Sequence, residues 1–255
     1  MFNFLIVSLI FVFGMCIGSF LNVCIYRLPT SKSIVDPPRS ICPGCNNPIR
    51  FYDNIPVLSY IWLKGRCRNC DAPISFRYPM VELITGVVAV GLLFKFGLSL
   101  EGLVYFVFIS SLIVITFIDL DHQIIPDIIT LPGIPIGLVA SFVLPQISFK
   151  SSVLGLLMGG GSLWLVAWAY SLIAKRDGMG GGDIKLLAMI GTLIGWQGVI
   201  FTIFASSVMG SVVGITIMLF KGKNMKFAIP FGPFLSIGAI AYVFLGSEFI
   251  AWYFS

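Results

Sequence analysis

Long apolar stretches alternate with short polar segments along most of the chain. The stretches cover residues 2–25, 80–97, 102–119, 128–146, 152–174, 184–197, 198–220 and 227–254. A helix needs about 20 mostly apolar residues to cross a bilayer, and most of these stretches approach that length. The pattern therefore predicts an all-α polytopic membrane protein with about eight transmembrane helices. Only Trp196-Gln197-Gly198 separates the sixth stretch from the seventh.

The first apolar stretch has the features of a retained membrane span rather than of a signal peptide. No basic segment precedes it, and its small residues, Gly14 to Ser19, lie inside the apolar run instead of after it. We therefore expect a first span over residues 1–26 and a polar module over residues 27–79. A membrane domain of about seven spans would follow over residues 80–255.

Composition supports this division. The chain is 58% hydrophobic and only 11% charged, with a mean hydropathy of +1.00. Soluble domains carry about 25% charged residues, so the composition excludes the soluble two-domain protein that the length alone would allow. We expect the chain to lie in a lipid bilayer and to have no nucleic-acid partner.

The Lys and Arg residues are distributed unevenly between the predicted loops. Of the 16 in the chain, 14 fall on one side of the predicted spans, and only Lys95 and Lys150 fall on the other. The 14 are Arg27, Lys32, Arg39, Arg50, Lys64, Arg66, Arg68, Arg77, Lys175, Arg176, Lys185, Lys221, Lys223 and Lys226. Because cytoplasmic loops carry the excess of basic residues, the N-terminus is expected outside and the module in the cytoplasm.

Four of the six cysteines lie in this module, as 42-CPGC-45 and 67-CRNC-70. Two CxxC turns at this separation fit a tetrahedral zinc site of four thiolates, formed by Cys42, Cys45, Cys67 and Cys70. Such a site is closed and therefore structural, and the metal would help to fold a module with little core of its own. Gly44 and Asn69 suit the bends that turn backbone amides toward the sulfurs.

The six cysteines also allow other roles. Two disulfides are the alternative for the module, but the cytoplasm keeps thiols reduced. Cys16 and Cys24 lie in the first span, where small buried packing residues are the default expectation.

Carboxylates occur at two span ends on the predicted cytoplasmic side. Asp119 closes the third apolar stretch, and Asp183 opens the sixth after Gly180-Gly181-Gly182. Ionisable residues in or beside spans are costly and are candidates for function. Asp127, which precedes the fourth span, is expected to be a helix N-cap.

The glycine stretch before Asp183 allows three interpretations. A phosphate-binding loop would need a preceding strand, but a long apolar stretch precedes these glycines and no Gly-Lys-Ser/Thr follows. A flexible connection with Asp183 as helix N-cap is the plainer alternative. The third interpretation pairs Asp183 with Asp119 at the membrane surface.

Such a pair would have specific chemistry. Two close carboxylates do not both ionise readily, so they share a proton. The ionised group can take a proton from water, and the protonated group can hydrogen-bond a scissile carbonyl. The single histidine, His122, is expected to be an exposed interfacial residue rather than a catalyst.

Together these segments resemble the type IV prepilin peptidase family of GxGD membrane aspartic proteases. The resemblance covers nearly the whole chain and rests on 18-GSFLNVCIYRLP-29, the two CxxC turns, 54-NIPVLSY-60, 73-PISFRYPMVEL-83, 119-DLDHQIIPD-127 and 179-MGGGDIKLLAMIG-191. It implies that Asp119 and Asp183 are catalytic and that Gly180 and Gly182 support the site. It also implies cleavage of prepilin leaders at the cytoplasmic face of the bacterial inner membrane, for type IV pili or type II secretion.

The same resemblance implies N-methylation of the new N-terminus with S-adenosylmethionine. Candidates for this second site are Glu82, Asn22 and Arg27. Glu82 could instead be an interfacial structural charge, and Asn22 an interhelical hydrogen-bond donor. Two other functions stay open at this point: a leader peptidase without methyl transfer, and a zinc-organised ion transporter or scaffold.

Overall fold

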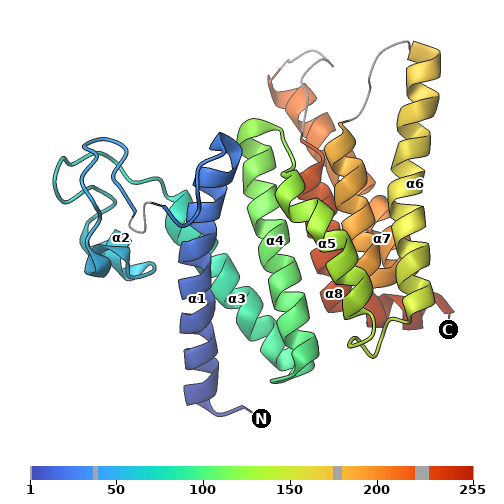
Figure 1. Ribbon diagram of the computed structural model, residues 1–255, viewed down its shortest axis with the longest axis horizontal. Helices are drawn as coiled ribbons and strands as arrows, with labels where there is room; N and C mark the ends of the chain where they lie inside the picture. Colours follow the sequence, from blue (N-terminus) through green and yellow to red (C-terminus); the bar gives the residue numbers. More distant parts are fainter. Residues whose placement is uncertain (1, 37–39, 175–179, 222–229, 255) are drawn as a thin grey trace. The chain divides into compact units, whose positions relative to one another are not determined.

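The computed structural model describes residues 2–36, 40–174, 180–221 and 230–254, with the backbone alone at 174, 221 and 247–254. It consists of helices joined by short connections (Figure 1). The helices are α1 (Phe4–Arg27), η1 (Leu28–Thr30), η2 (Phe51–Asn54), α2 (Leu58–Trp62), α3 (Arg77–Phe96), α4 (Leu100–His122), α5 (Asp127–Ala140), α6 (Phe149–Ala174), α7 (Gly181–Lys221) and α8 (Gly232–Phe254). Over these ranges there is no strand, only two isolated bridges.

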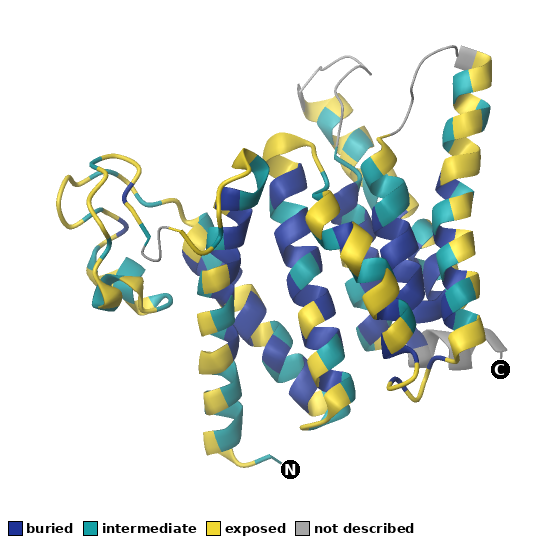
Figure 2. Ribbon diagram, in the orientation of Figure 1, coloured by how far each residue is buried: buried dark blue, intermediate teal, exposed yellow. Residues whose placement is uncertain are grey.

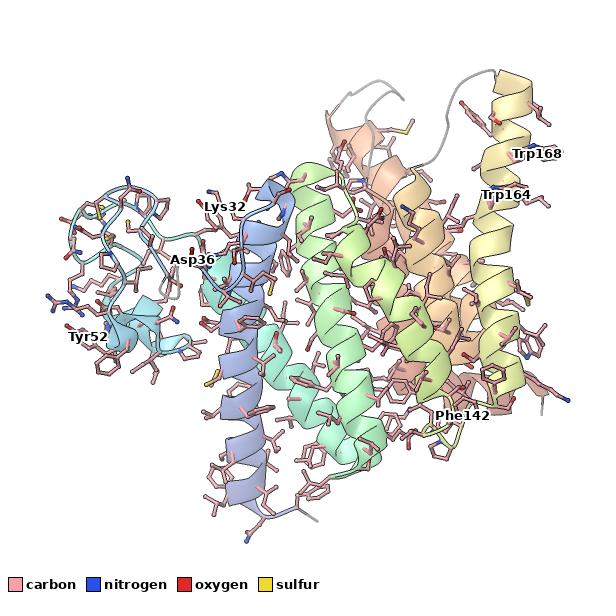
Figure 3. All side chains as sticks on the ribbon, in the orientation of Figure 1. Lys32, Asp36, Tyr52, Phe142, Trp164 and Trp168 are labelled. Carbon is pink, nitrogen blue, oxygen red and sulfur yellow. The ribbon has the colours of Figure 1, made fainter. Side chains whose placement is uncertain are left out.

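The expectation of an all-helical membrane protein is confirmed. Within the described ranges, five helices are long and apolar enough to cross a membrane, namely α1, α3, α4, α6 and α7. On α6, Trp164 and Trp168 are exposed and their rings stack with centroids 6.3 Å apart (Figure 3). The count of eight spans stays a prediction. Five of the basic residues that predict the orientation lie outside the described residues, namely Arg39, Lys175, Arg176, Lys223 and Lys226.

Two boundaries differ from the expected ones. The stretch 128–146 is helical only to Ala140, and this helix contains Pro132 and Pro135. The sixth and seventh stretches fall within the single element α7, whose backbone leaves the helical path at Gly195 (φ 70°, ψ 178°). The break therefore lies next to the Trp196-Gln197-Gly198 sequence that predicted it.

The chain divides into two compact units, Met1–Val114 and Ile115–Ser255. In the first unit, α1 and α3 run antiparallel and approach closely at glycines. A Cβ on Gly14 would lie 2.8 Å from Ala89 Cβ, and one on Gly18 would lie 2.7 Å from Glu82 Cα. Small residues allow such contact between membrane helices. The domain boundaries expected at residues 26 and 79 stay a prediction.

In the second unit, the first part of α7 is the buried centre (Figure 2). Leu186, Leu187 and Ile190 are fully buried there. A Cβ on Gly133 of α5 would lie 2.3 Å from Met189 Sδ, and one on Gly155 of α6 would lie 2.1 Å from a backbone oxygen of α7. Because α5 and α6 both pack closely on α7, the start of α7 is held on a rigid support.

Candidate functional site

Asp119 lies in the last turn of α4 and is only 5% exposed. The fully buried Ile118 precedes it. Three residues later α4 ends, where Gln123 adopts a positive φ of 55° and donates its backbone amide to Asp119 O at 2.9 Å. The abrupt helix end therefore places a buried carboxylate at the boundary of an apolar span.

The carboxylate of Asp119 is held by the start of α8. The backbone amide of Gly232 donates a buried hydrogen bond to Asp119 Oδ2 at 3.0 Å. A Cβ at residue 232 would lie 2.6 Å from the same oxygen, so only glycine fits without displacement. The free amides at a helix N-terminus favour a negative group there.

Asp183 lies in the first turn of α7, and its backbone amide bonds to Gly180 O at 3.2 Å. It follows the first residues of the helix instead of capping it, so the N-cap alternative is wrong. Asp183 is close enough to Asp119 for the two carboxylates to interact electrostatically. The two aspartates, separated along the chain, are thus brought into one site.

Ile125 packs against the helix starts around this pair. A Cβ on Gly182 would lie 2.9 Å from Ile125 Cβ, and one on Gly232 would lie 3.3 Å from Ile125 Cδ1. Among the described residues, Gly180 and Gly181 have no such close neighbour. Within that part of the chain, only Gly182 of the three glycines is therefore required by packing, because its backbone approaches Ile125.

Asp127 does not cap α5, contrary to the expectation. Pro126 takes the N-cap position, and both carboxylate oxygens of Asp127 accept hydrogen bonds from Lys185 Nζ at 2.8 Å. The pair joins the start of α5 to α7, two residues beyond Asp183. Both side chains are substantially exposed, so the bond contributes about 1 kcal/mol or less.

Sequence reasoning missed Gly232. The available signal was 230-PFGPF-234, in which Pro233 directly follows the glycine. Proline is favoured in the first turn of a helix, so this segment could have been identified as a helix start. That its amide meets Asp119 depends on packing between residues more than 100 positions apart and has no local signal.

The four module cysteines form one cluster, with all their sulfurs within 4.8 Å of one another. Cys42 Sγ and Cys70 Sγ lie 3.9 Å apart, and none of the four is in a disulfide. Tetrahedral zinc with bonds of about 2.3 Å to sulfur needs sulfurs about 3.8 Å apart. The donor set and spacing therefore fit a metal ion such as zinc.

The two CxxC turns have the same backbone structure. Cys42 N bonds to Asn47 O and Cys67 N to Ala72 O, at 3.0 and 2.9 Å. The left-handed residues are Asn46 and Asp71, which follow each second cysteine. The backbone of Gly44 hydrogen-bonds the Cys42 sulfur, as expected of this bend. A Cβ on Gly44 would lie 3.1 Å from Ala72 Cβ, so a larger residue there would require Ala72 to move.

Hydrogen bonds to the sulfurs, and an ion pair beside them, stabilise the cysteine cluster. Burial raises the pKa of the Cys42 thiol, but hydrogen bonds from the backbone of Cys45 and Gly44 and from the side chains of Cys67 and Cys45 together outweigh burial and lower the pKa to about 7. Arg68 binds Asp53 in a bidentate pair with a shortest distance of 2.6 Å. This bond holds the pKa of Asp53 below its ordinary value and links the second turn to η2.

The methyl-transfer candidates are gathered on neighbouring helices of the first unit. Glu82 is 8% exposed, and its Oε2 accepts the backbone amide of Val57 at 2.8 Å. Asn22 donates to Tyr78 O at 3.1 Å, which is the interhelical bond of the structural alternative. Arg27 Nη1 binds Ser33 O and Ile34 O, so it braces the chain that leaves α1.

The remaining candidates are His122 and the two cysteines of α1. His122 is exposed, as expected of an interfacial residue. Cys24 is buried as expected, but Cys16 is exposed on α1, so the expectation of buried packing is wrong for it.

Known proteins are similar to the chain over most of its length. Residues 12–96 match the bacterial peptidase A24 N-terminal domain, and residues 106–215 match the type IV leader peptidase family. A prepilin leader peptidase/N-methyltransferase of Aeromonas hydrophila is 38% identical over 96% of this chain and 93% of its own length. Proteins of the same name from Pseudomonas putida and Legionella pneumophila are 37% and 36% identical, over 96% and 99% of this chain and 92% and 94% of their lengths. No solved structure matches the chain.

Proposed function

Because the chain belongs to the type IV leader peptidase family, we propose that it removes the leader peptide of type IV prepilins or pseudopilins and then methylates the new N-terminal residue. The observation that carries the peptidase activity is the meeting of Asp119 and Asp183 at helix ends, with Gly232 bound to Asp119. Both activities appear in the names of relatives that match nearly the full length of the chain.

The aspartate pair would carry the hydrolysis. One carboxylate takes a proton from water as the water attacks the scissile carbonyl, while the other, protonated, hydrogen-bonds the carbonyl oxygen. Gly232 fixes the orientation of the Asp119 carboxylate through its amide. No side chain of the described residues crowds Gly180 or Gly181, which suits the approach of an extended substrate strand.

We place this site at the cytoplasmic face of the bacterial inner membrane. The support is the excess of Lys and Arg on one side of the spans and the position of both aspartates at helix ends. Extended backbone inside lipid leaves amides without partners, so a substrate is cut more readily at the interface. An eight-span arrangement, with α7 crossing in two segments around Gly195, is part of this proposal.

Two further groups complete the proposal. Zinc would be held by Cys42, Cys45, Cys67 and Cys70 and would fold the module without touching the substrate. S-adenosylmethionine would supply the methyl group. The buried Glu82 carboxylate would take a proton from the ammonium of the processed N-terminus, which frees the nitrogen lone pair to accept the methyl group, and Asn22 and Arg27 would brace the helix ends around it.

The Glu82→Gln variant is expected to lower methylation about tenfold or more and to leave leader removal within about twofold of the unchanged protein. Glutamine keeps the shape and the bond from Val57 but removes the negative charge. Methylated and unmethylated products are quantified by mass spectrometry. Glu101→Gln, on α4, is the matched control, and equal methylation in both variants would show that Glu82 is a structural charge.

The Gly232→Ala variant is expected to lower the rate of leader removal about 10²-fold, because misplacing a reacting group by about 1 Å has this effect. The added methyl group meets Asp119 Oδ2, and the carboxylate must move. Gly161→Ala is the control, since a Cβ there meets no atom of the described residues within 4 Å. A Gly232→Ala protein that processes substrate as fast as the control would exclude a positioning role for this glycine.

The proposed function is tested by incubating the purified protein with a model prepilin, with and without S-adenosylmethionine. We expect product masses that show leader removal in both reactions and methylation only in the reaction that contains S-adenosylmethionine. An unmethylated product in both reactions would show that the protein is a leader peptidase without methyltransferase activity. No cleavage, together with ion flux in liposomes, would favour the transporter instead.

A further inference from the structure

The short helix α2 has an unusual surface for part of a cytoplasmic module. Leu58, Ile61 and Trp62 are 56%, 63% and 48% exposed. Phe76, whose ring lies 6.2 Å from that of Tyr60, adds a further exposed aromatic side chain at the start of α3. Contiguous exposed apolar surface of this kind indicates contact with a partner or a membrane.

The residue before α2 is tied to a buried position on a membrane helix. The amide of Val57 donates to Glu82 Oε2 at 2.8 Å. Val57 has a φ of 61°, which is rare for a β-branched residue and is retained only where the surroundings impose it. The start of α2 is therefore fixed against α3.

This tie sets the depth of α2. Glu82 lies level with Gly18 of α1, because a Cβ on Gly18 would be 2.7 Å from Glu82 Cα. Gly18 precedes the end of α1 by nine residues, or about 13 Å along the helix. Val57 lies within one side-chain length of that level. In agreement, Figure 1 shows α2 at the height of the upper part of α1 and not beyond its end.

Basic residues follow α2 where the chain turns away. Lys64 and Gly65 both have positive φ, 51° and 67°. The chain therefore turns away from the direction of α2 at these two residues. Lys64 and Arg66 are exposed. An aromatic and apolar face flanked by Lys and Arg is the arrangement of segments that lie in the headgroup region of a bilayer.

We propose that α2 is an interfacial anchor, seated in the bilayer leaflet on the module's side. Leu58, Ile61 and Trp62 contact the upper acyl chains, and Lys64 and Arg66 face anionic headgroups. The occupant of this surface is lipid, because the bond to Glu82 holds α2 at the depth where lipid surrounds the outer face of α1 and α3. The inference does not depend on either proposed enzymatic activity.

The test uses the full-length protein in lipid nanodiscs and the fluorescence of Trp62, obtained as the difference between the unchanged protein and Trp62→Phe. Lipids brominated high on the acyl chain are expected to quench Trp62 more strongly than lipids brominated near the chain end. Brominated phosphatidylglycerol is expected to quench the fluorescence of Trp62 more strongly than phosphatidylcholine that is brominated at the same position.

Two results would overturn the proposal. Quenching by aqueous iodide, with none by brominated lipid, would place α2 in water. Protection from both quenchers would show that protein, such as a second copy of this chain, covers α2. Equal quenching by the two headgroups would overturn the part assigned to Lys64 and Arg66.

A pair of variants separates anchoring from a general effect of charge. Ile61→Glu is expected to lower lipid quenching of Trp62 more than about twofold. Val35→Glu is the control, since Val35 is 80% exposed in the segment that Arg27 binds at the end of α1. The metal content of both variants reports whether the module is folded, and unchanged quenching in a folded Ile61→Glu protein would contradict the anchor.

Discussion

Replacing either Asp119 or Asp183 by asparagine is expected to lower the rate of leader removal by about 10³-fold or more. Asparagine keeps the size of the side chain and can still accept the amide of Gly232 at position 119. It cannot, however, take a proton from water or share one with its partner. The measurement is a time course of product formation followed by mass spectrometry.

The control for this prediction is Asp121→Asn. Asp121 is exposed and lies two residues beyond Asp119 on the same helix. We expect its variant to process prepilin within a few-fold of the normal rate, because exposed charges contribute little. Methylation of a substrate that already lacks its leader should survive in all three variants. Normal leader removal by Asp119→Asn or Asp183→Asn would exclude the aspartate mechanism.

Loss of one cysteine ligand is expected to have the second large effect. Cys42→Ser removes a ligand from a closed four-sulfur cluster, and structural zinc contributes about 10–16 kcal/mol of binding free energy that is coupled to folding. The bound zinc should fall from about one per chain to near zero. The module should then be cut rapidly by trypsin, since Arg50 between the two CxxC turns is already exposed.

Cys16→Ser is the control for the cysteine prediction. Cys16 is exposed on α1, in a span outside the module. Metal analysis and limited proteolysis should not distinguish this variant from the unchanged protein. Retention of metal by Cys42→Ser, or a mass that rises by about 2 Da per disulfide when the module of the unchanged protein is reduced, would contradict a four-thiolate site.

The parts of the fold that follow from local composition were predictable. Apolar length located α1, α3, α4 and α6 to within a few residues, because a bilayer imposes a minimum length on each helix. The cysteine cluster followed from spacing, since two CxxC turns can enclose a metal only by meeting each other.

Features that depend on contacts between distant residues were not predictable. Asp127 was expected to cap a helix, but it binds Lys185, whose position depends on the packing of α5 against α7. The amide of Gly232 meets Asp119 only after α4 and α8 come together. The depth of α2 depends on Glu82, whose negative charge alone did not indicate a partner in the module.

The candidate active site illustrates both cases. Each aspartate was identified from its place at the end of an apolar stretch, because charged groups are rare in such positions. Their proximity required the fold, in which α7 is held by glycine contacts with α5 and α6. The packing of Gly182 against Ile125 also could not be predicted from the sequence, because three consecutive glycines look alike there.

The most direct test of the central claim, that Asp119 and Asp183 act as one catalytic unit, is the rate of leader removal by the double variant. Groups that act as a unit have strongly non-additive effects when both are replaced. We therefore predict that Asp119→Asn/Asp183→Asn leaves the same residual rate as each single variant. A double variant whose loss equals the product of the two single losses would contradict the account, because it would show that the two carboxylates act independently.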